Sequence, residues 1–231
     1  MAGADAEWDE WFAALFGPEG LQAKKTYGWP LGGDDEACCA RMTTLFERAG
    51  TLLQGVSDDR VAEGLDFLLN PSLSNWGPSA VDPSVPLAVR ARYVRSVLGL
   101  FEGVFLPRLG DASGAPARPP PPPLGRLCYG FFDTTPLLTW TGPEGSEVEE
   151  ESGYEAWSLL GRVLLLPSHA CAESSLEGML HYSFVPTSWR SLSDILARLP
   201  RRAVELTPRL GHVLGQVCGL VWSDAGRGRA T

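Results

Sequence analysis

The stretch between Pro86 and Pro107 constrains the fold most, because it carries the clearest helical pattern in the chain. Its apolar side chains recur every three or four residues and make one stripe: Val94, Val97, Leu98, Phe101, Val104 and Phe105. Charged residues such as Arg92 and Glu102 lie off that stripe. This spacing is typical of an amphipathic α-helix. Since proline suits the first turn of a helix but interrupts its interior, the pattern predicts one helix that begins at Pro86 and ends at Pro107.

The same spacing recurs along the rest of the chain, between breaks rich in glycine and proline. It predicts further helices at about residues 5–16, 34–49, 57–70, 154–166, 168–185, 189–199 and 208–222. Residues 71–85 are expected to be a loop. Ile195 is the single isoleucine, which favours helix over sheet. The expected fold is therefore all-α, either a helical bundle or a HEAT-like α-solenoid of about eight helices.

Residues 111–123 are rich in glycine and proline and end in five consecutive prolines. Such a run favours an extended polyproline II spacer of about 3 Å per residue. It divides the chain into an N-terminal helical half, residues 1–110, and a C-terminal helical half, residues 124–231. We expect the two halves to pack as one body.

Charge and composition narrow the classes of partner. The formal net charge is −9, and an acidic chain is repelled by phosphate backbones, so nucleic acid is not an expected partner. No stretch reaches the roughly 18 uninterrupted apolar residues of a membrane span, so no membrane partner is expected either. Residues 1–16 lack the basic start and apolar run of a signal peptide. The five cysteines are then expected to be reduced, and the protein cytoplasmic.

The predicted helix at residues 168–185 carries an unusual polar stripe. His169, Glu173, Glu177 and His181 follow one another at steps of four, so a helix stacks them along one face. Imidazole and carboxylate groups are ligands of zinc and iron, and Asp133 and His212 are the candidates for one further ligand. A divalent metal is therefore one hypothesis for this stripe. The alternative is a structural network of Glu–His hydrogen bonds, which needs no cofactor.

Other residues are candidates for structural or interaction roles. Cys128, Cys171 and Cys218 are expected to be buried structural thiols, and Asp133 to cap the segment that follows it. Trp76 and Trp189 lie in or near predicted loops, where they either anchor a protein interface or pin the loops to the core. Arg198, Arg201 and Arg202 make either a basic patch for an acidic partner or a solvated helix face.

Two motifs resemble those of a set of uncharacterised bacterial all-helical, HEAT-like proteins. They are Cys128-Tyr129-x-x-Phe132-Asp133 and Ala170-Cys171-x-Glu173-Ser174-x-Leu176-x-Gly178-x-x-His181. In the similar proteins C-Y-x-x-W-D is followed by A-C-x-E-S-A-L-H-G-L-G-H. The resemblance implies a HEAT-like fold and no particular activity. This chain departs from the pattern at Glu177, which replaces the first of two histidines, and at Phe132, which replaces tryptophan.

The sequence therefore predicts a non-catalytic protein that acts by contact with another protein, for instance an immunity-like or accessory protein. An acidic helical protein of this kind would mask a basic surface of its partner. The competing hypothesis is a metal-dependent enzyme with a Glu/His site on the helix at residues 168–185.

Overall fold

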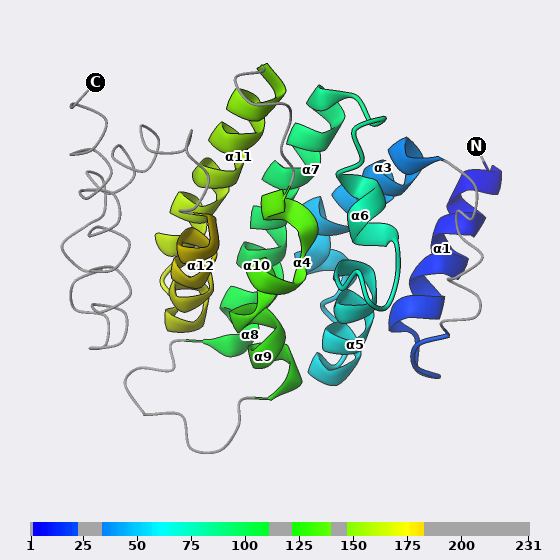
Figure 1. Ribbon diagram of the computed structural model, residues 1–231. Coiled ribbons are helices and arrows are strands. Elements are labelled where there is room, and N and C mark those ends of the chain that lie inside the picture. Colours follow the sequence, from blue (N-terminus) through cyan, green and yellow to red (C-terminus); the bar gives the residue numbers. More distant parts are fainter. Residues whose placement is uncertain (1, 23–33, 111–121, 140–146, 183–231) are drawn as a thin grey trace, which may run out of the picture.

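The computed structural model describes residues 2–22, 34–110, 122–139 and 147–182 (Figure 1). These ranges contain helices and no strand, which confirms the all-α expectation. The α-helices are α1 (Ala2–Phe16), α3 (Asp35–Glu47), α4 (Ala49–Leu52), α5 (Asp58–Leu69), α6 (Trp76–Ala80), α7 (Leu87–Leu100), α8 (Leu106–Leu109), α9 (Pro123–Tyr129), α10 (Phe131–Thr134), α11 (Glu147–Leu164) and α12 (His169–Tyr182). A π-helical turn, η1 (Phe101–Phe105), joins α7 to α8, and a 3₁₀ turn, η2 (Pro136–Thr139), follows α10. The helices predicted at 189–199 and 208–222 lie outside the described residues.

The helices form two rows. In one row α3 packs against α7, and α7 packs against α11. In the other row α5 packs against α9, and both α9 and α10 pack against α12. Figure 1 shows α1 beside α5 at one end of the rows and the α11–α12 pair at the other. Among the helices in the described ranges, none combines the length and the apolar composition that a membrane span requires.

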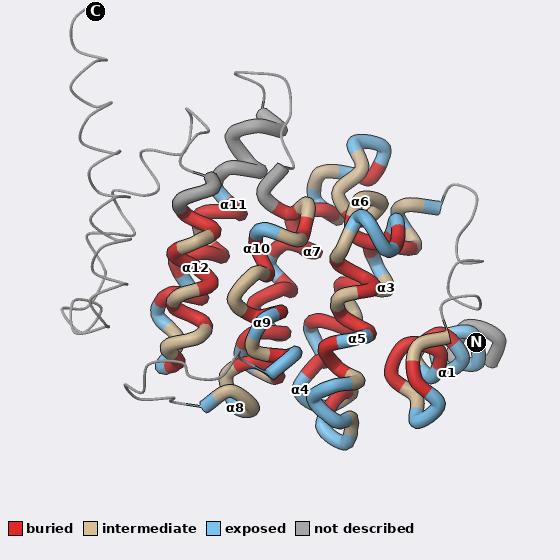
Figure 2. Tube along the Cα trace, turned by 60° about the horizontal axis from the view of Figure 1, so that its bottom comes forward, coloured by how far each residue is buried: buried red, intermediate tan, exposed pale blue. Residues whose placement is uncertain are grey.

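One hydrophobic core runs through both rows. It extends from Trp11 on α1 to Met179 on α12 and includes Phe101 of η1 and Leu160 of α11. Figure 2 shows that the buried residues lie where the helices face one another. Helices from before and after residues 111–121 therefore share a core, although those residues themselves are outside the described ranges.

Side-chain caps lie at the starts of two of the predicted helices. The Asp34 carboxylate accepts a hydrogen bond from the backbone N–H of Ala37 at 2.9 Å, which satisfies one of the free donors at the start of α3. The Ser168 hydroxyl oxygen accepts a longer bond, 3.5 Å, from the N–H of Cys171 in the first turn of α12. These caps fix where the two helices begin.

The prediction that Pro107 ends its helix is wrong. The helix continues to Leu109, with Pro107 at the second position of α8. The turn just before it is a π-turn, in which the N–H of Leu106 bonds to the carbonyl of Phe101. Proline lacks an N–H and its ring crowds the preceding turn, and the wider π-turn accommodates this without ending the helix.

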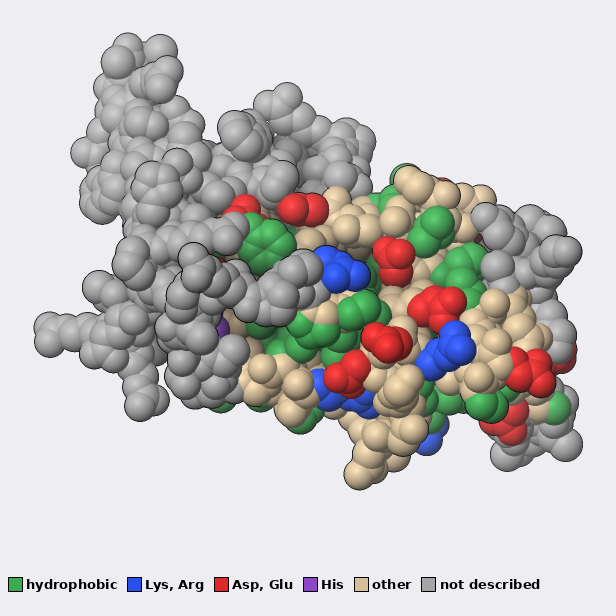
Figure 3. Space-filling model, turned by 90° about the horizontal axis from the view of Figure 1, so that it is seen from below, with side chains coloured by type: hydrophobic (Ala, Val, Ile, Leu, Met, Phe, Trp, Pro, Cys, Tyr) green, Lys and Arg blue, Asp and Glu red, His purple; other side chains and the backbone are tan. Residues whose placement is uncertain are grey.

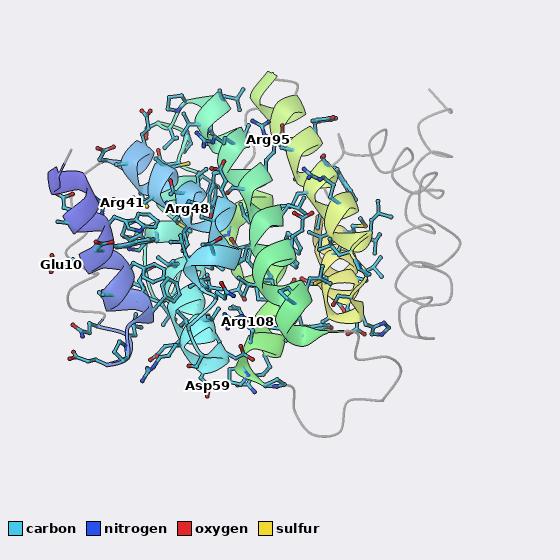
Figure 4. All side chains as sticks on the ribbon, turned by 180° about the vertical axis from the view of Figure 1, so that it is seen from behind. Glu10, Arg41, Arg48, Asp59, Arg95 and Arg108 are labelled. Carbon is cyan, nitrogen blue, oxygen red and sulfur yellow. The ribbon has the colours of Figure 1, made fainter. Side chains whose placement is uncertain are left out.

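Arg108 connects this helix to the loop between α4 and α5. Its guanidinium donates to the carbonyl oxygens of Leu53 and Val56, the latter at 2.8 Å, and pairs with the Asp58 carboxylate at 2.8 Å (Figure 4). One side chain thus satisfies backbone acceptors at the end of α4 and a carboxylate at the start of α5.

Glycines let the segment α3–α4 approach the segment α7–η1 closely. A Cβ atom at Gly99 would lie 2.6 Å from the carbonyl oxygen of Phe46, and one at Gly103 would lie 2.6 Å from the backbone nitrogen of Gly50. Real Cβ atoms do not come so close, so any side chain at these positions would push the segments apart.

Candidate functional site

The predicted polar stripe lies on α12 as expected, but one of its members is engaged by another helix. The Tyr129 hydroxyl on α9 donates a hydrogen bond to the Glu177 carboxylate on α12, at 2.7 Å. Tyr129 lies 48 positions earlier in the chain, so spacing along α12 did not indicate this contact, and the predicted Glu–His hydrogen bonds stay a prediction. His181 belongs to α12, and its side chain is outside the described part of the structure.

No three His, Cys, Asp or Glu side chains gather as metal ligands among the described residues. His169 and Glu173 are half-buried on α12, and Asp133 is exposed on α10. His212, the other possible ligand named from sequence, lies outside the described residues. Asp133 is also not the cap of a following helix, because it is the third residue of the short helix α10.

Cys128 and Cys171 bring two thiols together between α9 and α12. Both side chains are completely buried, both are free thiols, and each affects the pKa of the other. The pKa of Cys171 is held below its ordinary value by the hydrogen bond from Cys128, and also by Ser168, despite the burial that would raise it. The pKa of Cys128 is raised, because its proton is held in that bond and its surroundings are apolar. The predicted burial of both cysteines is confirmed, while Cys218 is outside the described residues.

The two sequence motifs meet at this contact. Besides the thiol pair and the bond between Tyr129 and Glu177, Phe132 packs so closely on Gly178 that a Cβ there would lie 2.9 Å from the Phe132 Cβ. Sequence reasoning missed this pairing of α9–α10 with α12. Cys171 and Gly178 are seven residues apart and so share a helix face, but helical spacing alone does not identify the partner helix.

Trp76 lies in the core and not on the surface that an interface anchor needs. It is 3% exposed, and its ring centroid is 5.2 Å from that of Trp11. The predicted loop at 71–85 contains the short helix α6, which begins at Trp76 and carries it inward. Of the two roles predicted for Trp76, interface anchor or attachment of the loop to the core, its burial therefore supports the second. Trp189, Arg198, Arg201 and Arg202 lie outside the described residues.

A groove that sequence reasoning did not identify lies between α5 and α9–α10. Its volume is about 630 Å³, and it is lined by Asp59, Ala62, Glu63, Asp66, Pro123, Arg126, Leu127 and Thr134. Figure 3 shows Asp and Glu side chains around an apolar patch on the lower face of the molecule, with Arg side chains among them. The available signal was the spacing of the three acids, which follow one another by four and three residues and so share a face of α5.

The three acids of the groove differ in their partners. Glu63 pairs with Arg60 at 2.6 Å, and Asp66 accepts a hydrogen bond from the Asn70 amide at 3.3 Å. Asp59 is exposed and has no hydrogen bond or ion pair with any described residue; the Arg108 guanidinium pairs with the neighbouring Asp58 instead. The groove therefore offers at least one carboxylate whose charge no described residue neutralises, above a floor that includes Ala62 and Leu127.

Comparison of the chain with models of protein families, with curated proteins and with solved structures yields no match.

Proposed function

We propose that this chain is a non-catalytic, cytoplasmic interaction protein with a HEAT-like stack of helices, and that its α5–α9 groove binds a basic segment of another protein. The observation that carries the proposal is the acidic groove itself, lined by Asp59, Glu63 and Asp66 on one wall.

The shape of the groove suits a few side chains of a partner. A volume of about 630 Å³ falls in the usual range of binding pockets. The three acids span seven residues of α5, or about 10 Å along the helix axis. A partner helix with basic residues at positions i, i+4 and i+7 presents its charges over the same length.

The chemistry of the lining supports a basic and partly apolar partner. Carboxylates on α5 attract arginine or lysine, while Ala62, Leu127 and Pro123 can cover the apolar stems of these side chains. Arg126 on the opposite wall disfavours a partner with a uniformly basic surface. The net charge of −9 attracts the same class of partner from a distance.

The stacking of helices in two rows supports the HEAT-like interpretation, because α-solenoids are built from stacked helices. Such proteins use the surfaces between successive helices to bind other proteins, which fits the proposed role of the groove. In the most specific form of the proposal, the chain is an immunity-like protein that masks a basic surface of a toxin. The alternative of a metal-dependent enzyme gains no such support, since Glu177 is bonded to Tyr129.

The test uses a fluorescein-labelled helical peptide with arginine at positions i, i+4 and i+7, titrated with the full chain and followed by fluorescence anisotropy. We expect saturable binding that weakens steeply as salt increases, as for any interaction steered by charge. The variant Asp59→Asn, Glu63→Gln, Asp66→Asn should weaken binding by at least about tenfold.

The control variant is Asp9→Asn, Glu10→Gln, Glu36→Gln, which removes the same charge from exposed positions on α1 and α3. Figure 4 labels Glu10 on α1 and Asp59 on α5. Equal loss of affinity in the two variants would show that net charge, and not the groove, attracts the peptide. Binding that ignores ionic strength would contradict the proposal as a whole.

A further inference from the structure

One of the three acids of the groove is held by a residue that does not line the groove. The Arg60 guanidinium pairs with the Glu63 carboxylate at 2.6 Å, and both residues belong to α5. Side chains three residues apart are neighbours on a helix surface, so this pair forms within the helix. Glu63 lines the groove, whereas Arg60 does not. The guanidinium therefore approaches the carboxylate from outside the groove.

The turn that follows α1 holds the Arg60 guanidinium in this position. Gly20 is buried and has a φ of +82°, in the left-handed region that favours glycine. A Cβ atom at Gly20 would lie 2.2 Å from Nη1 of Arg60 and 2.8 Å from its Cζ, so the guanidinium fills the space that a side chain there would occupy. Arg60 thus lies between Gly20 and Glu63. Contacts on both sides restrict its side chain, which lowers the entropy that the ion pair costs.

The other two acids have no such cation. Within the described ranges, no ion pair joins Asp59 or Asp66 to another residue, and the hydrogen bond that Asp66 accepts at 3.3 Å comes from the neutral amide of Asn70. Asp59 and Asp66 are seven residues apart, which is about 10 Å along α5. The groove therefore presents two negative charges two turns apart, with a neutralised acid between them.

We propose that Arg60 determines the specificity of the groove, so that the groove selects partner helices with two cationic side chains two turns apart, opposite Asp59 and Asp66. This inference rests on the proposed function, because it requires that the groove binds a basic segment.

A partner's cation opposite Glu63 gains little, because it has to displace Arg60. The exchange replaces one cation by another on the same carboxylate, so the number of ion pairs does not increase. Arg60 belongs to the same helix as Glu63, which gives it the high effective concentration of an intramolecular group. Its positive charge also repels the incoming cation. Cations opposite Asp59 and Asp66 meet no such competitor, so these two positions determine the affinity.

The experiment compares two fluorescein-labelled helical peptides of identical composition. The first has arginine at positions i, i+4 and i+7. In the second, the middle arginine is exchanged with the residue at i+2, which faces away from the groove. Both peptides are titrated with the full chain and followed by fluorescence anisotropy.

The unsubstituted protein should bind the two peptides with affinities that agree within about 1.5-fold, because Arg60 occupies the acid that the middle arginine would contact. Arg60→Gln should bind the first peptide about three- to fivefold more tightly than the second, the gain expected of one exposed ion pair with Glu63. Arg60→Met, which keeps an apolar stem beside Gly20, should give the same preference. Thermal unfolding checks that each variant is folded.

Two control variants assign the effect to this ion pair. Arg92→Gln removes the same charge from a pair in the other row of helices, that with Glu47 at 2.9 Å, and should leave the ratio of the two affinities unchanged. Arg60→Gln combined with Glu63→Gln should lose the preference for the first peptide, because the carboxylate that binds the middle arginine is absent.

The outcomes distinguish this inference from the proposed function. If neither peptide binds the unsubstituted chain saturably, the proposed function fails and the role of Arg60 fails with it. If both peptides bind and Asp59→Asn, Glu63→Gln, Asp66→Asn weakens them, but Arg60→Gln and Arg60→Met keep the ratio of the unsubstituted protein, only the role of Arg60 is overturned. An unsubstituted protein that already prefers the first peptide by about threefold or more overturns it too.

Discussion

Four consecutive residues of α9 take part in two different contacts, one with α5 and one with α12. Arg126 and Leu127 border the open acidic groove beside α5, whereas Cys128 and Tyr129 are engaged by α12. The α12 side is closed, with buried thiols and a glycine against a phenylalanine ring. The α5 side is open, and no residue in the described part of the chain pairs with its Asp59 carboxylate. The two sequence motifs belong to the closed side, so in this chain the motif residues indicate helix packing. The candidate binding surface has a weaker signal in the sequence, namely the spacing of three acids on α5.

The largest effect should come from Phe132, which joins the closed contact to the core. It is 3% exposed and its ring stacks on Phe101 at a centroid distance of 5.7 Å. We expect Phe132→Ala to lower the free energy of unfolding by about 3–5 kcal/mol, through lost burial and the cavity left behind. Urea denaturation of the full chain measures this.

Tyr154→Ala is the control for that truncation, because Tyr154 is 61% exposed and its loss should change stability by less than about 0.5 kcal/mol. Similar losses for the two variants would mean that α10 does not pack on α12 as described.

Gly178 tests how tightly α12 fits against its neighbours. Gly178→Ala places a Cβ within 2.9 Å of Phe132 and 2.8 Å of Leu160. We expect a cost of about 1–3 kcal/mol from overpacking, although alanine is the better helix former. Gly55→Ala is the matched control, since a Cβ at Gly55 has no atom within 4 Å. Thermal unfolding should show a lower Tm for the first variant only, and an unchanged Tm for both would contradict the close contact.

The bond between Tyr129 and Glu177 should contribute less than the apolar contacts. A double-mutant cycle with Tyr129→Phe and Glu177→Gln is expected to give a coupling free energy of about 0.5–1.5 kcal/mol, the net value of one hydrogen bond. Chemical denaturation of the four proteins measures it. A coupling of zero would place Glu177 on the polar stripe of α12 without a structural partner on α9.

The smallest effect on stability should come from the groove. The variant Asp59→Asn, Glu63→Gln, Asp66→Asn removes two exposed charges and one half-buried one, and among described residues only Glu63 has an ion-pair partner, so stability should stay within about 1 kcal/mol of the unsubstituted protein. The same variant should lose affinity for the basic peptide. A large loss of stability, measured by urea denaturation, would assign these acids to folding and remove the distinction between the two sides of α9.

Local signals predicted local structure well. The apolar stripe at residues 94–105 identified α7, and the same spacing at 34–49 and 168–185 identified α3 and α12, because helical spacing depends on residues close in sequence. The π-turn before Pro107 was missed because proline usually ends a helix, and the short helix at Trp76 was missed because residues 71–85 are rich in proline.

Pairings between helices were not predictable in the same way. An apolar or polar stripe shows which face of a helix is buried or charged, but it does not specify the helix that will cover that face. The stripe on α12 therefore suggested a metal site, whereas the Glu177 carboxylate accepts a hydrogen bond from Tyr129 on α9. The groove was missed for the same reason, because it exists only through the position of α9 beside α5.

The π-turn at Phe101–Phe105 sets the rotational phase of everything after it on that helix. One residue more or less turns the following side chains by about 100° around the axis. In a regular α-helix, Arg108 would face a different direction and could not reach the carbonyls of Leu53 and Val56. The single extra residue of that turn thus determines the direction of the Arg108 side chain, which points to the junction of α4 and α5. Deletion of one residue there would turn the side chain away from that junction.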